Sequence, residues 1–295
     1  MSRLSGVICT LAFVLAAAAG EDRSADHPPW TGDWPAAVAA ARRQVSVDTD
    51  DSGAWLSLGR VLFEQGRPED LDEALSCLER AVELEPELAA AWFWLGRAGG
   101  QAAGGGGVLN RIRLAGKARA AFTRAAELEP DSFQFVYALV QFHLQAPAMV
   151  GGDRQKAAAL AAGFNPGRPE ERALLVAAVR LAGRDFPGPL EQLDQVGPFA
   201  DRLVAETWLV LAGQLGTALL DRGRWLEAAE VCQRVTGRSP ETASGWLGLG
   251  RALAGLDHAA EAEAACRQCL ALAPDGPLAD AANAVLAGLR VEVGE

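Results

Sequence analysis

The sequence of 295 residues is poor in aromatic side chains and in net positive charge. Aromatic residues make up 6% of the chain and include a single tyrosine, and the formal net charge is −11. Phosphate backbones and anionic lipid surfaces attract positively charged proteins, so this balance argues against nucleic-acid or membrane-surface binding by the molecule as a whole. Half of the residues are hydrophobic, which is ample for a core.

The sequence also lacks the usual patterns of catalytic and metal sites. It has no HExxH, no GxSxG and no paired-carboxylate arrangement, and its three histidines, His27, His143 and His258, lie far apart. The glycine-rich stretch 99–110 is not a phosphate loop, since such a loop follows a strand and its lysine is followed by serine or threonine, whereas Lys117 is followed by alanine. We therefore predict no enzymatic activity, no cofactor and no metal.

The first twenty residues have the layout of a secretory signal peptide. A short positive start precedes an apolar run from Leu4 to Ala19, which ends in small residues before a charged segment. The run is shorter than the roughly 20 residues that span a bilayer. We expect cleavage and export to the periplasm or beyond the cell, with an uncleaved anchor as the alternative. No later apolar run is judged long enough for a membrane span, so we expect none after signal cleavage.

The C-terminal part of the chain repeats itself with a period of 34 residues. The last copy is marked by Trp246, Leu249, Gly250, Leu253, Ala262, Cys266, Cys269 and Pro274. One period earlier stand Ala212, Leu215, Gly216, Leu219, Ala228, Cys232, Val235 and Pro240, each of them small, apolar or identical. Copies with insertions start at Trp55 and Trp92, and a third copy, starting at Val136, lacks the glycine.

This pattern resembles the tetratricopeptide repeat (TPR), as found in exported bacterial proteins, over about residues 52–290. The resemblance implies an all-α fold in which antiparallel helix pairs, each with a first helix A and a second helix B, stack into a right-handed superhelical solenoid with a C-terminal capping helix. The expected divisions are a signal peptide (1–20), a flexible lead-in (21–33), a lead-in helix (34–51), repeats with glycine-rich insertions (52–168), a degenerate helical repeat (169–208), two regular repeats (209–274) and a capping helix with a tail (275–295).

The resemblance also implies a partner-binding groove. In this family, groove-facing side chains commonly come from the second, fifth, ninth and twelfth positions of helix A. Carried over to this chain, they are Leu56, Arg60, Phe63, Phe93, Arg97, Tyr137, Gln141, Leu144, Thr217, Leu247 and Arg251. Such a mixture of apolar side chains and arginines suits a peptide or a helix with an acidic residue. The lysine, asparagine and arginine set of the family's carboxylate clamp is not found together, and plain surface arginine is the alternative.

A local basic patch stands out in this acidic chain. The segment 111–124 contains no acidic residue, and its basic residues are Arg111, Arg113, Lys117, Arg119 and Arg124. It indicates contact with an anionic partner, either an acidic protein segment or lipid headgroups. The alternative is the solvated face of a B helix.

The cysteine pair Cys266 and Cys269 falls on packing positions of a B helix. Side chains three apart in a helix have Cβ atoms about 5–6 Å apart, whereas a disulfide needs about 3.5–4.5 Å. We interpret both as buried thiols that pack as small apolar side chains. A disulfide that joins Cys232 to one of them across the stack stays open.

Taken together, these patterns predict a non-catalytic scaffold that binds a protein or peptide in its concave groove. The alternative is a structural or assembly factor of the cell envelope that docks through its convex face or its basic insert.

Overall fold

The computed structural model describes residues 33–105, 107–165, 167–197 and 201–292. The chain divides into two compact units, unit 1 up to Leu175 and unit 2 from Val176 onward. Within the described ranges every regular element is helical, with fourteen α-helices, two short 3₁₀ helices and no strand. This confirms the predicted all-α class.

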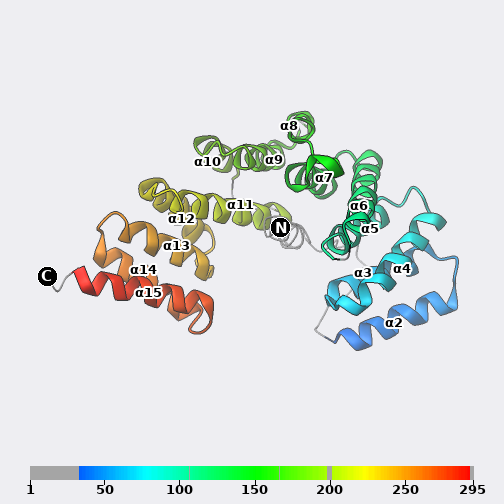
Figure 1. Cartoon of the computed structure of the whole chain (residues 1–295), viewed down its shortest axis with the longest axis horizontal. Helices are drawn as coiled ribbons and strands as arrows, with labels where there is room; N and C mark the ends of the chain where they lie inside the picture. The colour runs from blue at the N-terminus through cyan, green and yellow to red at the C-terminus, as the bar shows by residue number, and fades with distance from the viewer. Residues whose placement is uncertain (1–32, 106, 166, 198–200, 293–295) are drawn as a thin grey trace. The chain divides into compact units, whose positions relative to one another are not determined.

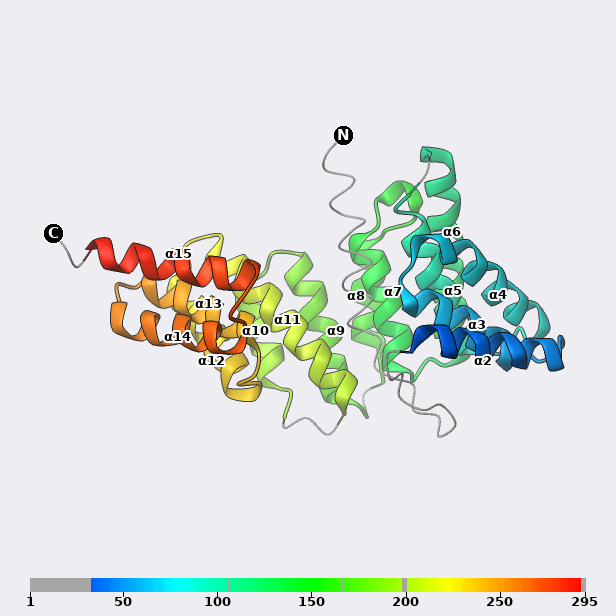
Figure 2. The same cartoon turned by 90° about the horizontal axis from the view of Figure 1, so that it is seen from below.

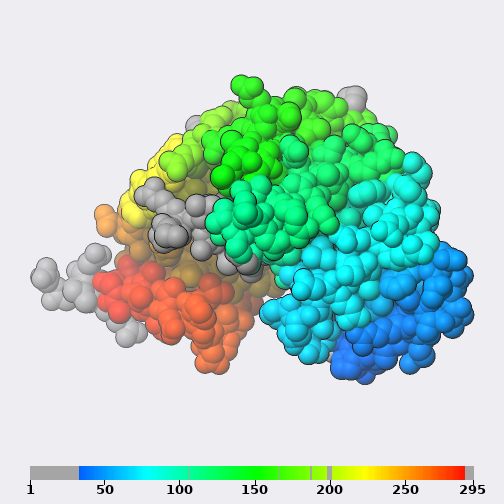
Figure 3. Space-filling model, turned by 45° about the vertical axis from the view of Figure 1, so that its right-hand side comes forward, coloured from blue at the N-terminus to red at the C-terminus, as the bar shows by residue number. Residues whose placement is uncertain are grey.

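Unit 1 is a lead-in helix followed by three helix hairpins, which Figures 1 and 2 show stacked in chain order. Its α-helices are α2 (Trp34–Val47), α3 (Ser52–Gln65), α4 (Leu71–Leu84), α5 (Ala89–Ala102), α6 (Val108–Leu128), α7 (Phe133–Gln145) and α8 (Arg154–Gly163), and its 3₁₀ helices are η1 (Pro68–Asp70) and η2 (Ala148–Val150). The hairpins are α3–α4, α5–α6 and α7–α8, so α3, α5 and α7 are A helices. In the space-filling view the surfaces of α2 to α6 run into one another without a break (Figure 3).

Aspartate side chains cap the N-termini of several of these helices. Asp51 Oδ1 accepts hydrogen bonds from the backbone N–H groups of Gly53 (2.8 Å) and Ala54 (3.1 Å), and Asp33 and Asp153 cap α2 and α8 in the same way. Each cap satisfies N–H groups that have no partner inside the helix. At the other end of α3, Gly66 adopts the left-handed conformation (φ 75°) that terminates the helix.

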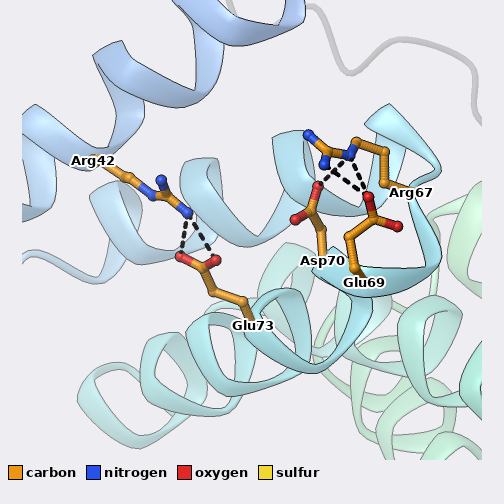
Figure 4. A network of polar contacts seen from close by, with 5 residues as sticks. All are labelled: Arg42, Arg67, Glu69, Asp70 and Glu73. Atoms are coloured by element: carbon orange, nitrogen blue, oxygen red, sulfur yellow. Dashed lines mark hydrogen bonds and ion pairs between the residues drawn. The ribbon is translucent and has the colours of Figure 1, made fainter.

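Ion pairs on the surface join α2 to the first hairpin. Arg42 Nη2 lies 2.9 and 2.8 Å from the two carboxylate oxygens of Glu73 on α4 (Figure 4). In the turn between α3 and α4, Arg67 pairs with Glu69 (2.7 Å) and Asp70 (3.5 Å). Exposed pairs of this kind contribute about 0–1 kcal/mol each, so they add little to the stability of the fold.

Unit 2 contains the two regular repeats and the C-terminal cap. The boundary between the units falls inside α9 (Pro169–Ala182), and the following helices are α10 (Pro187–Asp194), α11 (Arg202–Leu220), α12 (Trp225–Arg238), α13 (Ala243–Ala254), α14 (Ala259–Leu272) and α15 (Pro277–Glu292). The last hairpin and the cap lie where the sequence pattern places them, and α15 packs on α13 and α14. Helix α11 starts earlier than expected, inside the segment treated as degenerate, because buried Val204 and Trp208 continue its apolar face.

One expectation about membrane spans needs correction. Helix α11 is long and apolar enough, by length and composition only, to cross a membrane, so the expectation of no such run after the signal segment was wrong. Half of its most apolar window is buried inside the unit, and it packs on α12 and α13. A core helix of a protein outside the membrane passes the same test of length and composition.

The repeat glycines lie where the two helices of a hairpin cross. A Cβ atom on Gly250 would lie 2.5 Å from Cys266 Sγ, and one on Gly59 would lie 2.6 Å from Leu78 Cγ. The equivalent contacts in the other hairpins are Gly96 with Phe122 and Gly216 with Cys232. The B-helix side chain therefore fills the space that the glycine leaves.

The third hairpin solves the same packing problem differently. In α7 the glycine position is taken by Val140, and the corresponding B-helix position is Ala161, and both are buried. A larger side chain on helix A is thus matched by a smaller one on helix B, which keeps the packed volume similar.

The repeat tryptophans hold the loop before each hairpin. Trp55, Trp92 and Trp246 each donate an indole Nε1–H hydrogen bond of 2.8–2.9 Å to a backbone carbonyl six residues earlier. The rings are partly buried, and the indole N–H fixes the entry of the chain into helix A.

Candidate protein-binding surface

Eight of the eleven predicted groove residues lie on the three A helices of unit 1. They are Leu56, Arg60 and Phe63 on α3, Phe93 and Arg97 on α5, and Tyr137, Gln141 and Leu144 on α7. We call this set, together with Glu64 and Trp94 described below, the A-helix strip. The other three, Thr217 on α11 and Leu247 and Arg251 on α13, belong to unit 2.

Aromatic rings surround the guanidinium group of Arg97. Its Cζ atom lies 4.3 Å from the ring centroid of Trp94, 5.0 Å from that of Phe63 and 5.8 Å from that of Phe93. Because ring faces carry partial negative charge, they attract the cation. The Cζ atom of Arg60, one hairpin earlier, lies 5.0 Å from the centroid of the same Trp94 ring.

Arg97 is buried without a full set of hydrogen-bond partners. Arg97 is 4% exposed. Neither its Nε nor its Nη1 atom has a hydrogen-bond acceptor within the described structure. Burial lowers the pKa of Arg97 to about 10, an effect that the nearby Glu64 carboxylate opposes. Glu64 is itself paired with Arg60 at 3.3 Å, so the charge of Arg97 is only partly balanced.

A second group of buried polar atoms lies on α7. Gln141 forms a hydrogen bond with Tyr137, whose pKa is raised by burial, and its Oε1 accepts a bond of 2.8 Å from Gln145 Nε2. The Oε1 atom of Gln145 is buried and has no partner among the described residues. The A-helix strip therefore contains unused donors at Arg97, and Gln145, next to its member Leu144 on α7, has an unused acceptor.

The predicted groove residues differ widely in exposure. Phe93, Arg97, Tyr137, Gln141 and Leu247 are buried, Leu56, Arg60, Phe63 and Leu144 are partly buried, and Thr217 and Arg251 are exposed. The position rule of the family missed Trp94 and Glu64, which complete the surroundings of Arg97. The aromatic run Trp92–Phe93–Trp94 was the available sequence signal, because it places two adjacent rings around the turn before Arg97.

Most of the basic patch is occupied within the chain. Lys117 Nζ lies 2.7 Å from Glu79 on α4, Arg124 lies 2.8 Å from Glu87, and Arg113 bonds Asn110 at 2.9 Å. The contacts of Lys117 and Arg124 attach α6 to the segment before it, and that of Arg113 lies within α6.

The remaining two residues of the patch differ from each other. The Nε–H of Arg111 donates to the Ala103 carbonyl at 3.3 Å. The guanidinium of Arg119 forms no ion pair or hydrogen bond with any residue that the structure describes. Arg119 is therefore the member of the patch that remains available to a ligand.

The described cysteines are buried free thiols. They are Cys77, Cys232, Cys266 and Cys269. Burial raises the pKa of Cys77, Cys232 and Cys266 to about 11, so that these thiols are protonated near neutral pH and react poorly. Across the described ranges, no three His, Cys, Asp or Glu side chains are placed to hold a metal ion.

Comparisons with known proteins identify the repeats. Two models of the tetratricopeptide repeat match the chain, one at residues 31–70 and 214–277 and the other at 52–98. Both units therefore contain tetratricopeptide repeats, which are typically protein–protein interaction scaffolds without catalytic activity. No curated protein sequence matches the chain.

Solved structures with the same architecture are remote in sequence. A tetratricopeptide repeat protein from Parabacteroides merdae has 13% identity and a TM-score of 0.50, covering 88% of this chain and 93% of that one. The APC/C hetero-tetramer Cut9–Hcn1 has 14% identity and a TM-score of 0.53, covering 96% of this chain but only 52% of that one. YrrB, a TPR protein with an unusual peptide-binding site, has 16% identity and a TM-score of 0.40, covering 84% and 99%. The first two show the fold, a TPR-like helical solenoid.

Proposed function

We propose that this chain is a non-catalytic scaffold that holds a peptide or helix of a partner protein on the A-helix strip of unit 1. The observation that carries the proposal is the Arg97 guanidinium, which is buried among three rings while Nε and Nη1 lack acceptors. A carboxylate of the partner would supply an acceptor to one of these two donors, and a second polar group of the partner would supply the other. A hydrogen bond from a guanidinium to a carboxylate is charge-assisted, which adds affinity.

The energetic cost of Arg97 supports a binding role over a structural one. A charged group taken out of water destabilises the fold unless a partner of opposite charge offsets the lost hydration. The same low-dielectric surroundings strengthen the attraction of an incoming carboxylate. A buried cation that is incomplete in the free protein is therefore suited to bind an anionic group of a partner.

The rest of the strip offers complementary contacts to a peptide. Leu56, Phe63 and Leu144 are partly buried apolar side chains that could cover apolar residues of the partner. The unpaired Oε1 of Gln145 would accept a hydrogen bond from a peptide N–H group. The preferred partner would thus combine an acidic residue with apolar neighbours.

Site-specific photocrosslinking in the full-length protein tests this proposal. We would place p-benzoylphenylalanine at Phe63 and, as a matched control, at Val47, which is 87% exposed on α2. A partner adduct is expected at position 63 only, and Arg97→Glu should abolish it. Arg97 is changed alone because Phe93 is 1% exposed, and its truncation to alanine would cost about 3–5 kcal/mol of stability. An adduct at position 63 that persists in folded Arg97→Glu would refute the proposal.

A second candidate function is assembly in the cell envelope through the convex face or the basic insert, with an anionic partner. The support for it is Arg119, whose charge has no partner in the described structure, although most of the patch is paired internally. Charge reversal at Arg113 and Lys117 distinguishes the two functions. It should weaken partner capture at low salt if the insert docks, and leave the Phe63 adduct unchanged if the A-helix strip does.

Export is a further part of the proposal. It is supported by the apolar run and small-residue end of residues 1–20, which lie outside the described residues. Mass spectrometry of the N-terminus of protein recovered from the native host tests it. A mature N-terminus after Ala19 or Gly20 is expected, and an intact Met1 would argue for the anchor.

A further inference from the structure

A hollow on the B-helix side of unit 1 forms a second binding site, separate from the A-helix strip. It has a volume of about 1020 Å³ and lies between α6, α7 and α8. We propose that this hollow binds an amphipathic helix that carries acidic residues beside an apolar stripe. The proposal does not depend on the function proposed for the A-helix strip.

The two sites lie on opposite faces of α7. The A-helix strip uses Tyr137 and Gln141, whereas the hollow is lined by Val136, Leu139 and His143. At about 100° per residue, the mean directions of the two sets differ by roughly 145° around the helix axis. A ligand in one site therefore does not touch the other.

The floor of the hollow is apolar and its walls carry small side chains. Val136, Leu139 and Leu160 contribute branched aliphatic groups to the lining, and Ala159 and Gly163 on α8 take up little space. The volume matches the upper end of the range of about 300–1,000 Å³ that is usual for ligand sites. It has room for several apolar side chains from one face of a helix.

Two cations that form no ion pair or side-chain hydrogen bond with a described residue flank this floor, although the Asp153 carboxylate lies near enough to Lys156 to interact with its charge. Arg119 on α6 and Lys156 on α8 both line the hollow, and neither side chain forms an ion pair or hydrogen bond with a described residue. Arg119 is held close to the turn before α8: a Cβ atom on Gly151, which has a φ of 97°, would lie 2.6 Å from Arg119 Nη1. The positive charge is therefore local and positioned, although the chain as a whole is acidic.

Charge and geometry together favour an acidic helix over other ligands. The remaining charged lining residues are Arg124, which pairs with Glu87 and Glu127, and Glu127 itself; His143 is buried, which lowers its pKa and favours its neutral form. Two unpaired cations beside an apolar floor complement glutamates that flank a leucine stripe. An amphipathic helix presents an apolar stripe and its flanking charges on one face, as this lining requires.

Fluorescence anisotropy with a designed probe tests the proposal on the full-length protein. The probe is a labelled synthetic helix of about 16 residues with leucines at helical spacing and glutamates on both flanks. We expect saturable binding that weakens at least about tenfold in the Arg119→Glu, Lys156→Glu double variant. Ala159→Trp, which fills the hollow without changing charge, should weaken binding to a similar extent.

Matched controls separate the hollow from general electrostatics. The Arg113→Glu, Lys117→Glu double variant makes the same charge change on α6 outside the hollow and should alter the affinity by less than about twofold. A probe in which lysines replace the glutamates should not bind.

Several results would overturn the proposal. They are equal losses in the two double variants, an unchanged affinity in Ala159→Trp, or no saturable binding up to about 100 µM probe. Phosphatidylglycerol vesicles that bind through Arg119 and Lys156 more tightly than the helix does would instead assign the hollow to lipid headgroups.

Discussion

Replacing Arg97 by methionine should stabilise the free protein, because it removes a buried charge that the fold does not fully compensate. Methionine has a similar length, bends to fit irregular space and makes favourable contacts between sulfur and aromatic rings. The rings of Trp94, Phe63 and Phe93 that now surround the guanidinium would therefore still be covered. Most substitutions of buried residues destabilise proteins, so a gain in stability here is a sharp expectation.

The size of the effect follows from the altered pKa. Burial lowers the pKa of Arg97 from its ordinary value to about 10, and the nearby charge of Arg60 adds to this effect. At about 1.36 kcal/mol per pKa unit, this corresponds to a cost of about 3 kcal/mol for the charged form. Attraction to the rings returns about 1–2 kcal/mol, which leaves a net cost of about 1–2 kcal/mol. The midpoint temperature of thermal unfolding should rise by about 2–4 °C for each kcal/mol of stability gained.

The pH dependence gives an independent check of the same reasoning. Because the pKa of Arg97 is lower in the folded protein, the unfolded chain binds more protons between pH 10 and 12.5. The wild-type fold is therefore penalised fully below about pH 10 and relieved as the pH rises through that value. The stability difference between Arg97→Met and wild type should be largest near pH 7–9 and shrink above pH 10.

Differential scanning calorimetry of both proteins, with circular dichroism to verify the helical content, measures this difference. If Arg97→Met unfolds at a lower temperature than wild type, Arg97 braces the fold and the argument for an incomplete binding site fails. Arg97→Lys is the matched comparison, since it keeps the charge but lacks the planar guanidinium. It should not show the stability gain.

Three further predictions concern packing. Gly250→Ala should lower the free energy of unfolding by about 1–3 kcal/mol, because its Cβ would meet Cys266 Sγ. The control Gly237→Ala lies on an exposed part of α12, where no atom lies within 4 Å of the added Cβ, and it should raise the free energy of unfolding by about 0.5–1 kcal/mol. Equal effects of the two substitutions in urea titrations would refute the crossing contact. The four buried thiols, including Cys232, should resist N-ethylmaleimide in the native protein and react in urea, and rapid native labelling counted by mass spectrometry would contradict their burial. Trp92→Phe should cost about 1 kcal/mol through the lost indole hydrogen bond, and an unchanged unfolding midpoint would show that the loop does not need it.

The repeat period was enough to predict the local architecture. A 34-residue recurrence of small and apolar positions placed the two regular repeats before residue 275 and the capping helix after it, which is where α13, α14 and α15 lie, and one of its recurring glycines, Gly250, lies at the helix crossing. These features depend on contacts inside one hairpin, whose two helices are neighbours in sequence. Spacing alone therefore specifies them. The third hairpin shows the limit of the pattern, because Val140 and Ala161 exchange sizes and still pack.

The surroundings of the groove positions could not be predicted in the same way. The tripeptide Leu-Gly-Arg occurs three times, yet its arginines have three environments. Arg60 pairs with Glu64, Arg97 is buried among aromatic rings without a full set of acceptors, and Arg251 is exposed. The difference comes from the preceding A helix, which supplies Phe63 to Arg97. A rule about positions within one repeat contains no information about its neighbour.

The hollow in unit 1 could not be predicted from the sequence for the same reason, because its lining comes from more than one hairpin. The sequence showed a basic patch in one continuous segment, but three of its five residues bind to the hairpin before it or to the start of α6 itself through side-chain acceptors. The cation that completes the hollow, Lys156, comes from the next hairpin, and the apolar floor comes mainly from α7. A binding surface in a stack of hairpins is formed between consecutive units, so its chemistry is a property of pairs of repeats. For this chain, the residues that decide partner choice should therefore be sought in variants that change two neighbouring hairpins at once, as Arg119→Glu with Lys156→Glu does.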